Sequence, residues 1–309
     1  MGQRAKSLRL IQSRQLEWHM HDLPSLCSHE VLIKTISCAI SIGSEVPVYR
    51  GDSRASRSNE YPKQMGYESY GEVIEVGCDV RRVQVGDRVV AFYGQQDYAI
   101  CNETGVIPVP KDIEPSIALL AILSCDAAKG VLKLQPNPSD RVVVTGLGTM
   151  GLLTTYFLRE YANVAHIDAV EPSKERAAVG MAFGVVRCVA DASALTPGYR
   201  LGFECSSRNK GFHSLQTLMD NNGRVCILSD GNYDEFTLHP DFFGKELNIV
   251  GSSDGWNYQE HAQWFFKNAT TTPHLSILFE HQVDQDAVIG CFRELAEESI
   301  HPLKVLVNY

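Results

Sequence analysis

The sequence of 309 residues predicts an α/β chain with two domains, a β-rich domain followed by a doubly wound parallel sheet. Strand-like runs separated by turns dominate the first hundred residues, whereas strand-like and helical runs alternate from Val142 onward. Three glycines in G-x-G-x-x-G spacing lie where that alternation begins. The length suggests two domains, and a hydrophobic content of 44% is sufficient for two cores.

The β-rich domain is predicted from short runs of β-branched and aromatic residues, with turn dipeptides such as Gly51-Asp52 and Gly86-Asp87 between them. A helix follows at Pro115–Leu134, and the prolines at 136 and 138 end it. We place the domain boundary within this helix, which gives domains 1–118 with 264–309, and 119–263. The predicted strands of the first domain are Val31–Thr35, Gly71–Val76, Arg88–Phe92 and Asp97–Cys101.

Alternation in the second domain predicts parallel strands joined by right-handed crossovers. The stretch from Tyr258 on carries two helices and two strands, and its last strand returns to the first domain. The predicted elements are strands at Val142–Val144, His166–Val170, Arg187–Ala190, Leu201–Glu204, Val225–Leu228, Leu247–Ser252, Phe279–Val283 and Lys304–Val307, with helices at Ser173–Phe183, Gly211–Met219 and Gln285–Ser299.

The glycine stretch predicts a dinucleotide site. Gly146 would make the tight turn, Gly148 would let the backbone approach a pyrophosphate, and Gly151 would allow close packing of helix on strand. The helix that follows offers its N-terminal N–H groups to phosphates. Glu171, at the end of the next strand, could accept hydrogen bonds from ribose hydroxyls, which favours NAD. Lys174 and Arg176 lie close by and leave NADP open.

Two alternatives compete with this interpretation of the glycine stretch. Residues 142–158 carry no charge, so a membrane span is conceivable, but three glycines and four threonines make it a poor one. The other alternative is a glycine turn that binds no dinucleotide. Glu171, at the spacing typical of a dinucleotide site, argues against it.

Composition excludes some partners. A net charge of −9 argues against nucleic acid or an anionic membrane surface. The first residues are basic but include no apolar segment of a signal peptide. Nine scattered cysteines without C-x-x-C indicate reduced thiols and a cytoplasmic protein.

Six segments in order resemble the medium-chain dehydrogenase/reductase superfamily. They are GYESYGEVIEVG (66–77), VGDRVV (85–90), GLGTMG (146–151), FECSS (203–207), NNGRVCILSDG (221–231) and ELNIVGSS (246–253). The resemblance implies a GroES-like catalytic domain and a Rossmann cofactor domain. It also implies that Thr149, Met150, Lys174, Cys205, Ser206 and Ser229 contact the cofactor with Gly146, Gly148, Gly151 and Glu171.

Zinc-dependent members of this superfamily hold a catalytic metal with a cysteine, the histidine of G-H-E and a third cysteine or glutamate. Here the first position falls on Ser41 or Ile42, the histidine is replaced by Tyr67, and the third falls near Ala121 or Cys125. Such side chains do not make a zinc site. The four-cysteine lobe of many relatives is also missing after Tyr93. We therefore expect a protein without zinc.

A narrower resemblance rests on three segments: ISIGSE (40–45), a small turn at Tyr49-Arg50-Gly51, and GYES (66–69). These segments are similar to a zinc-lacking branch that includes the bacteriochlorophyllide dehydrogenases, which oxidise a 1-hydroxyethyl group on a chlorin ring. The branch implies an NAD(P)-linked reaction between a secondary alcohol and a ketone.

Without a metal, a hydrogen-bond donor must stabilise the developing alkoxide. Tyr67 is the first candidate, although it could merely fill the vacated pocket. Ser41 is a weaker donor or relay. Glu45 and Glu68 are acidic groups beside that pocket, and either could accept the proton, although Glu68 fits a structural hydrogen-bonding carboxylate better. Candidates for the substrate pocket are Ile42, Tyr93 and Cys125, the last also fitting a core position.

Two further functions stay open at this level. One is a zinc-free quinone or activated-alkene reductase, which the GLGTMG turn resembles less well. The other is a cofactor-binding sensor or structural protein without turnover. The partners we expect are a small-molecule substrate and a second copy of the chain, paired through the edge strand at Leu247–Ser252.

Overall fold

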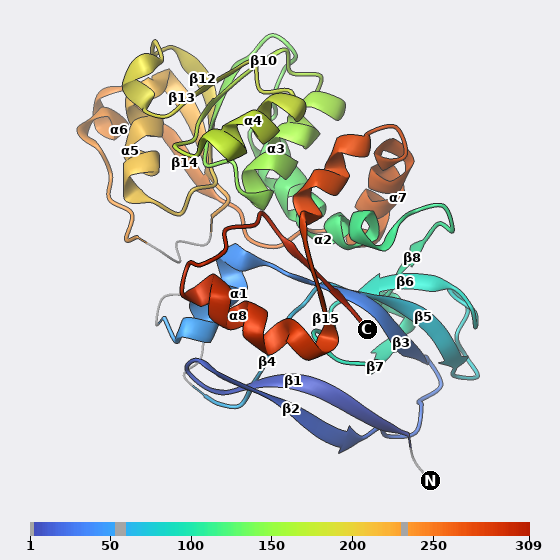
Figure 1. Ribbon diagram of the computed structural model, residues 1–309. Helices are drawn as coiled ribbons and strands as arrows, with labels where there is room; N and C mark the ends of the chain where they lie inside the picture. Colours follow the sequence, from blue (N-terminus) through green and yellow to red (C-terminus); the bar gives the residue numbers. More distant parts are fainter. Residues whose placement is uncertain (1–2, 53–59, 230–233) are drawn as a thin grey trace. The chain divides into compact units, whose positions relative to one another are not determined.

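The computed structural model describes residues 3–52, 60–229 and 234–309. It divides into two compact units, residues 1–121 with 259–309, and residues 122–258. Each unit is described by itself below, and Figure 1 labels its elements.

The first unit holds a mixed sheet of seven strands in the order β15-β16-β3-β5-β6-β8, with β7 also paired to β3. A smaller sheet has the order β2-β1-β4. The hairpin of β1 and β2 was not among the predicted strands. The bounds are β1 Arg4–Gln12, β2 Gln15–Asp22, β3 Glu30–Ile40, β4 Lys63–Gln64, β5 Ser69–Val76, β6 Arg88–Ala91, β7 Tyr98–Asn102, β8 Ile107–Val109, β15 His281–Asp284 and β16 Val305–Asn308.

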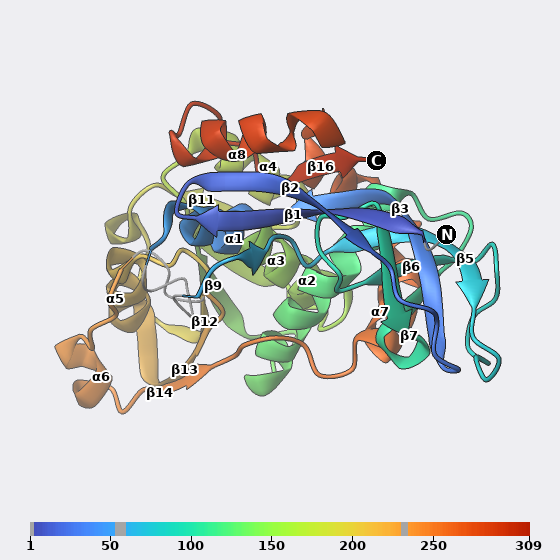
Figure 2. The same cartoon turned by 90° about the horizontal axis from the view of Figure 1, so that it is seen from below.

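Two helices, α1 (Ile42–Arg50) and α8 (Val288–Ala296), pack on the strands of this unit (Figure 2). The shared core joins apolar residues of β1, β3, α1, α8 and β16, among them Leu8, Ile40, Tyr49, Phe292 and Val305. The other helices described around this unit are η1 (Glu103–Gly105), α7 (Tyr258–Ala269), η3 (Pro273–Phe279) and η4 (Gln285–Ala287).

Helix α1 corrects one interpretation of the sequence. Tyr49 and Arg50 are the last helical residues rather than part of a separate turn, and Gly51 ends the helix at φ +76°. Only glycine adopts this left-handed conformation readily. Pro47 lies inside the helix and Gly43 in its first turn, so local propensity gives little sign of it.

The second unit is a parallel sheet of six strands in the order β11-β10-β9-β12-β13-β14, which confirms the predicted doubly wound fold. The order reverses between β9 and β12, so the crevice for a ligand is expected at their carboxyl ends. The strands are β9 Arg141–Thr145, β10 His166–Val170, β11 Arg187–Val189, β12 Tyr199–Glu204, β13 Met219–Ile227 and β14 Asn248–Gly251.

Helices occupy the crossovers between these parallel strands (Figure 1). They are α3 Thr149–Glu160, α4 Lys174–Ala182, the short η2 Ala192–Ala194, α5 Asn209–Leu218 and α6 Pro240–Gly244. The core of this unit includes Val143, Tyr199, Phe212, Leu215 and Val225. It therefore joins β9, β12 and β13 to helix α5.

Helix α2 (Pro115–Lys133) passes from one unit to the other. Among the described residues it is long and apolar enough to cross a membrane, but 67% of its most apolar window is buried inside the protein. A helix in the core of a protein has the same length, apolar composition and burial. All nine cysteines are free thiols.

Two predicted elements of the C-terminal stretch differ from the structure. The predicted strand Phe279–Val283 begins later, as β15, because η3 includes Phe279. The predicted helix Gln285–Ser299 is split into η4 and the shorter α8.

Candidate active site

The glycine turn of the second unit has the geometry that the motif predicts. Gly146 has φ +83°, and a Cβ there would lie 2.7 Å from Cα of Ser206. A Cβ on Gly151 would lie 1.9 Å from the carbonyl oxygen of Gly146. Neither position tolerates a side chain, since real Cβ atoms do not approach other atoms so closely. The turn therefore packs tightly against the 206 segment on one side and against α3 on the other.

Glu171 braces this turn. Its Oε2 accepts the backbone N–H of Leu147 at 2.8 Å, and its Oε1 accepts the N–H of Ser173 at 2.9 Å. The carboxylate is 7% exposed and each oxygen keeps a lone pair. Glu171 thus fixes the loops after β9 and β10 together at the place where a ribose would bind.

Helix α3 begins directly after the turn, with Gly148 as its N-cap and no side-chain hydrogen bond at that cap. Thr149 and Met150 form its first turn, and the glycine N-cap has no side chain of its own to occupy the N–H groups there. Lys174 is exposed at the start of α4. These residues fit a dinucleotide: the turn and helix N-terminus suit its pyrophosphate, and Glu171 suits its adenosine ribose.

A buried carboxylate, Glu204, organises the other predicted cofactor residues. The hydroxyls of Ser206 and Ser229 both donate to it, and so do the N–H groups of Ser206 and Ser207, at 2.8 Å and 3.3 Å. Burial raises the pKa of Glu204 in spite of these donors. Cys205 is fixed by its N–H, which donates to Thr145 O at 2.9 Å. Burial raises the pKa of its thiol well above the usual range.

In the first unit, three side chains from distant parts of the sequence form a buried charged cluster. Lys304 is fully buried and pairs with Glu68, which is 1% exposed. The Lys304 ammonium also donates to Ser41 Oγ at 2.6 Å, and Ser41 Oγ donates to Glu68 Oε2 at 3.2 Å. Burial raises the pKa of Glu68, although the ammonium opposes this shift. Glu68 is therefore a structural partner of Lys304 and Ser41 in this geometry.

Strand register explains how these residues meet. Val305 of β16 pairs with Ile40 of β3, so Lys304 lies beside Ser41 one residue beyond that pair. On the other side of β3, the N–H of Ala39 donates to Glu68 O at 3.0 Å. The sequence analysis did not identify Lys304, because a lysine at the start of a strand usually points to solvent.

Tyr67 lies beside this cluster and is partly exposed. Its hydroxyl is 3.1 Å from Ser44 Oγ, a contact that the sequence analysis also missed. Burial raises the pKa of Tyr67 well above its usual value, and the carboxyl groups of Glu68 and Glu45 raise it further. The phenol therefore keeps its proton at neutral pH and can donate it.

Glu45 caps the start of α1 from inside the helix. Its Oε1 accepts the N–H of Ser41 at 2.8 Å, while Oε2 is buried and has no hydrogen-bond partner among the described residues. Burial raises its pKa from 4.5 to about 8, and the nearby Glu68 adds to that shift. Glu45 is consequently a neutral acid over most of the physiological range.

This shift predicts a pH-dependent stability. Between pH 4.5 and about 8 the folded protein keeps the Glu45 proton that the unfolded chain has lost, so stability falls as pH rises. Glu45→Gln keeps the bond to Ser41 and removes the titration. We expect its free energy of unfolding at pH 8 to exceed the wild-type value by roughly 2 kcal/mol, with little gain at pH 4. Urea unfolding across this range measures it, with the exposed Glu75→Gln as control; an equal effect at both pH values would contradict the assignment.

The three predicted pocket residues lie in different places. Ile42 is the first residue of α1 and is partly exposed. Tyr93 is 5% exposed within an apolar core, and its hydroxyl accepts from Thr35 at 3.2 Å, which leaves it little surface for a substrate. Cys125 is fully buried in the second unit, against Gly255, as expected if it is a core residue and not part of a substrate pocket.

Several buried polar atoms without a hydrogen-bond partner in the described structure belong to the predicted site residues or to their neighbours. Within residues 3–52, 60–229 and 234–309, six buried side-chain atoms have no hydrogen-bond partner. Four belong to residues near the predicted catalytic or cofactor positions, Glu45 and Glu68 in one unit and Ser207 and Ser252 in the other. Buried polar groups are nearly always paired, so a ligand is a reasonable missing partner.

The donors present do not fit zinc. In the part of the chain that the structure describes, no group of three or more His, Cys, Asp and Glu side chains could hold a metal ion. The carboxylate of Glu68 is already paired with Lys304, and Ile42, Tyr67 and Ala121 are not zinc ligands.

Comparison with known proteins adds independent information. Residues 27–112 match the model of the alcohol dehydrogenase GroES-like domain. The chain is 24% identical to L-threonine 3-dehydrogenase of Vibrio parahaemolyticus over 264 residues, which is 72% of this chain and 76% of that protein.

Solved structures share the fold over nearly the whole chain. A dehydrogenase of Sinorhizobium meliloti 1021 that is described as zinc-binding, in a structure with NADP, has a TM-score of 0.85 at 17% identity, covering 99% of this chain and 100% of that one. A short chain alcohol dehydrogenase of Escherichia coli with NADH has a TM-score of 0.84 at 21% identity, covering 100% of both chains.

Proposed function

We propose that the chain is a member of the medium-chain dehydrogenase/reductase superfamily and a zinc-independent NAD(P)-dependent oxidoreductase acting on a secondary alcohol or ketone. The observation that carries the zinc-independent part is the Tyr67–Ser44 pair, a protonated phenol with a second hydroxyl at 3.1 Å, beside a charged cluster that is already internally paired. A phenol of this kind supplies the hydrogen bond that a metal would otherwise provide.

The dinucleotide, when bound, accepts or gives the hydride. In reduction, the Tyr67 hydroxyl donates to the carbonyl oxygen and passes its proton there as the alcohol forms. Ser44, which is partly exposed, relays a proton from solvent water to Tyr67 through their 3.1 Å contact: its hydroxyl takes up one proton from water as it passes its own to Tyr67. In oxidation the proton moves in the opposite direction. Lys304, Glu68 and Ser41 hold the surrounding chain segments in place and carry no proton in this scheme.

The cofactor would be held by the second unit alone. The Gly146–Gly151 turn and the start of α3 suit the pyrophosphate, and the Glu171 carboxylate suits free ribose hydroxyls better than a 2′-phosphate. This supports NAD as the preferred cofactor, with NADP as the weaker one. Titration calorimetry with both dinucleotides measures the ratio, and tighter binding of NADP would contradict the preference.

One experiment tests the proposal directly. The purified protein is assayed for zinc content and for turnover with NAD or NADP, before and after dialysis against a chelator. We expect well under one zinc per chain and the same turnover in both samples. A content of one zinc per chain, with activity lost when the zinc is removed and restored when it is added back, would contradict the zinc-independent mechanism.

The substrate panel for that assay follows from the sequence. The resemblance of ISIGSE and GYES to the bacteriochlorophyllide dehydrogenases makes a 1-hydroxyethyl chlorin the first compound to test. Simple secondary alcohols and ketones represent the wider class. Quinones and activated alkenes serve as comparison substrates, and turnover confined to them would replace the alcohol reaction by the reductase alternative.

A homodimer through β14 completes the proposal. Within the described residues β14 pairs with β13 on one side only, which leaves an edge that a second copy could extend. Leu238 and Phe243, which precede the strand, are 57% and 87% exposed. Analytical ultracentrifugation should give a dimer. Ile249→Pro removes an N–H on the unpaired edge, since the N–H of Ser252, and with it that of Val250, faces β13, and this variant should give monomer. A wild-type monomer would refute this assembly.

A further inference from the structure

Three serines lie at the carboxyl ends of β12 and β13, and their hydroxyls are not equivalent. Ser206 and Ser229 donate their hydroxyl protons to Glu204. Ser207 is 5% exposed, and its hydroxyl neither donates nor accepts within the described residues. A serine hydroxyl has a single proton, so Ser207 alone of the three can still donate to a ligand.

The backbone of Ser207 is unusual as well. Its φ is +58°, in the left-handed region that glycine adopts without strain. FECSS resembles a superfamily segment in which glycine occupies this position. Ser207 therefore has both a disfavoured backbone conformation and a buried hydroxyl without a partner in the described part of the chain. Such a combination is found where a residue serves a ligand.

The location identifies the ligand chemistry. The backbone of Ser206 lies against Gly146, as the 2.7 Å approach of a Cβ on Gly146 to Ser206 Cα shows. Gly146 opens the turn that approaches the pyrophosphate of a dinucleotide. A second unpartnered buried hydroxyl, Ser252, lies just beyond the carboxyl end of β14, on the same edge of the sheet.

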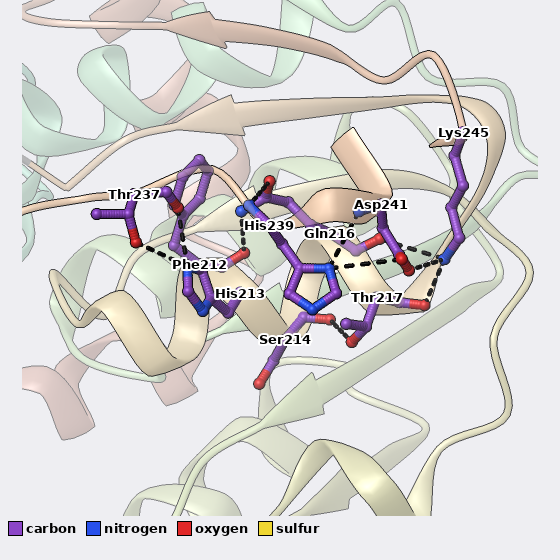
Figure 3. A network of polar contacts seen from close by, with 9 residues as sticks. All are labelled: Phe212, His213, Ser214, Gln216, Thr217, Thr237, His239, Asp241 and Lys245. Carbon is purple, nitrogen blue, oxygen red and sulfur yellow. Dashed lines mark hydrogen bonds and ion pairs between the residues drawn. The ribbon is translucent and has the colours of Figure 1, made fainter. Parts of the chain in front are cut away.

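The segment around Ser207 is held firmly. Its carbonyl accepts from Asp234 N at 3.2 Å, and the Asp234 carboxylate accepts the first N–H of α5, from Asn209, at 2.9 Å. The C-terminal half of α5 is tied to the chain after it by a polar network, drawn in Figure 3. There His213 Nε2 contacts Thr237, and Lys245 donates to Thr217 O at 2.7 Å. The hydroxyl is consequently presented by a fixed backbone.

We propose that the Ser207 hydroxyl donates a hydrogen bond to an oxygen of the pyrophosphate or the adjoining ribose of a bound dinucleotide. This assignment rests on the proposed function. It makes Ser207 a cofactor-binding residue particular to this sequence, in addition to Cys205, Ser206 and Ser229. It also accounts for the left-handed backbone of Ser207, since the hydrogen bond formed on binding offsets the conformational free energy that this backbone costs.

The test uses Ser207→Ala and Ser207→Gly in the full chain, with binding of NAD and ADP-ribose measured by calorimetry. Both variants lack the hydroxyl, but only Gly relaxes the backbone. We expect both to weaken NAD binding about threefold to tenfold, as loss of one hydrogen bond does. The unliganded Ser207→Gly protein should melt at or above the wild-type temperature. Weaker binding together with undiminished stability is not expected of a merely structural serine.

Asn222→Gly provides the matched control. Asn222 is also left-handed, at φ +59°, and lies in β13 between Met219 and Arg224, which both pair with β12 across an irregularity in the register. It should change stability without changing binding. Equal affinity of wild type and both Ser207 variants would overturn the proposal, as would a loss confined to Ser207→Gly or a loss seen with NAD but absent with ADP-ribose. Failure of the wild type to bind either dinucleotide would instead refute the proposed function.

Discussion

Tyr67→Phe should lower turnover by about 10²-fold or more, the usual contribution of a positioned general acid or base. The substitution removes only the hydroxyl that contacts Ser44 at 3.1 Å and leaves the ring in place. The loss should fall on kcat, with little change in dinucleotide affinity, because the residues proposed to bind the cofactor belong to the other unit. Steady-state kinetics with the substrate found in the panel measures it.

Two further variants make that result specific. Tyr70→Phe removes the hydroxyl of a neighbouring buried tyrosine and should leave turnover unchanged. Ser44→Ala should reduce turnover less than Tyr67→Phe, by about tenfold, because water can replace a relay more easily than a donor. If Tyr67→Phe retained full turnover, Tyr67 would be a packing residue that fills the place of a metal ligand.

Lys304→Met should destabilise the protein by about 3–5 kcal/mol, the effect of removing one member of a buried ion pair. Methionine keeps the length of the side chain, but Glu68 then loses its cation and Ser41 Oγ loses its donor. Because Glu68 can take up a proton, the loss should be smaller at pH 5 than at pH 8. Denaturant unfolding followed by circular dichroism gives the free energies.

The double variant Lys304→Met with Glu68→Gln should recover a large part of that loss, since no charge is then buried. Lys34→Met, at an exposed position of β3, is the control and should change stability by less than about 1 kcal/mol. A similarly small effect of Lys304→Met would mean that the cluster is not an energetic part of the fold.

The cofactor half of the site could be predicted because its signal is local. A strand, three glycines and a helix follow one another within 18 residues, and the structure forms β9, the turn and α3 from them. Glu171 could be found from its spacing alone. Ser207 could not, because neither its left-handed backbone nor its contacts with Glu204 and Asp234 leave a local pattern in the sequence.

The other half depends on pairing between distant residues. Tyr67 could be identified from its neighbours in sequence, but Lys304 reaches Ser41 only through the register of β16 on β3. The Ser44 contact with Tyr67 required α1, whose proline and glycine obscure the helical pattern. Sequence therefore indicated which residue types are present in this region, while nonlocal strand pairing decided which of them meet.

The two hydrogen bonds accepted by Glu171 have a consequence for cofactor engineering. Exchanging an acidic residue at this position for a small or cationic one is the obvious way to make an enzyme accept a phosphorylated ribose. Here the same carboxylate holds Leu147 of the glycine turn and Ser173 before α4. Replacing it would alter the shape of the turn together with the charge. A change of cofactor in this protein therefore requires a second substitution that restores an acceptor for those two N–H groups.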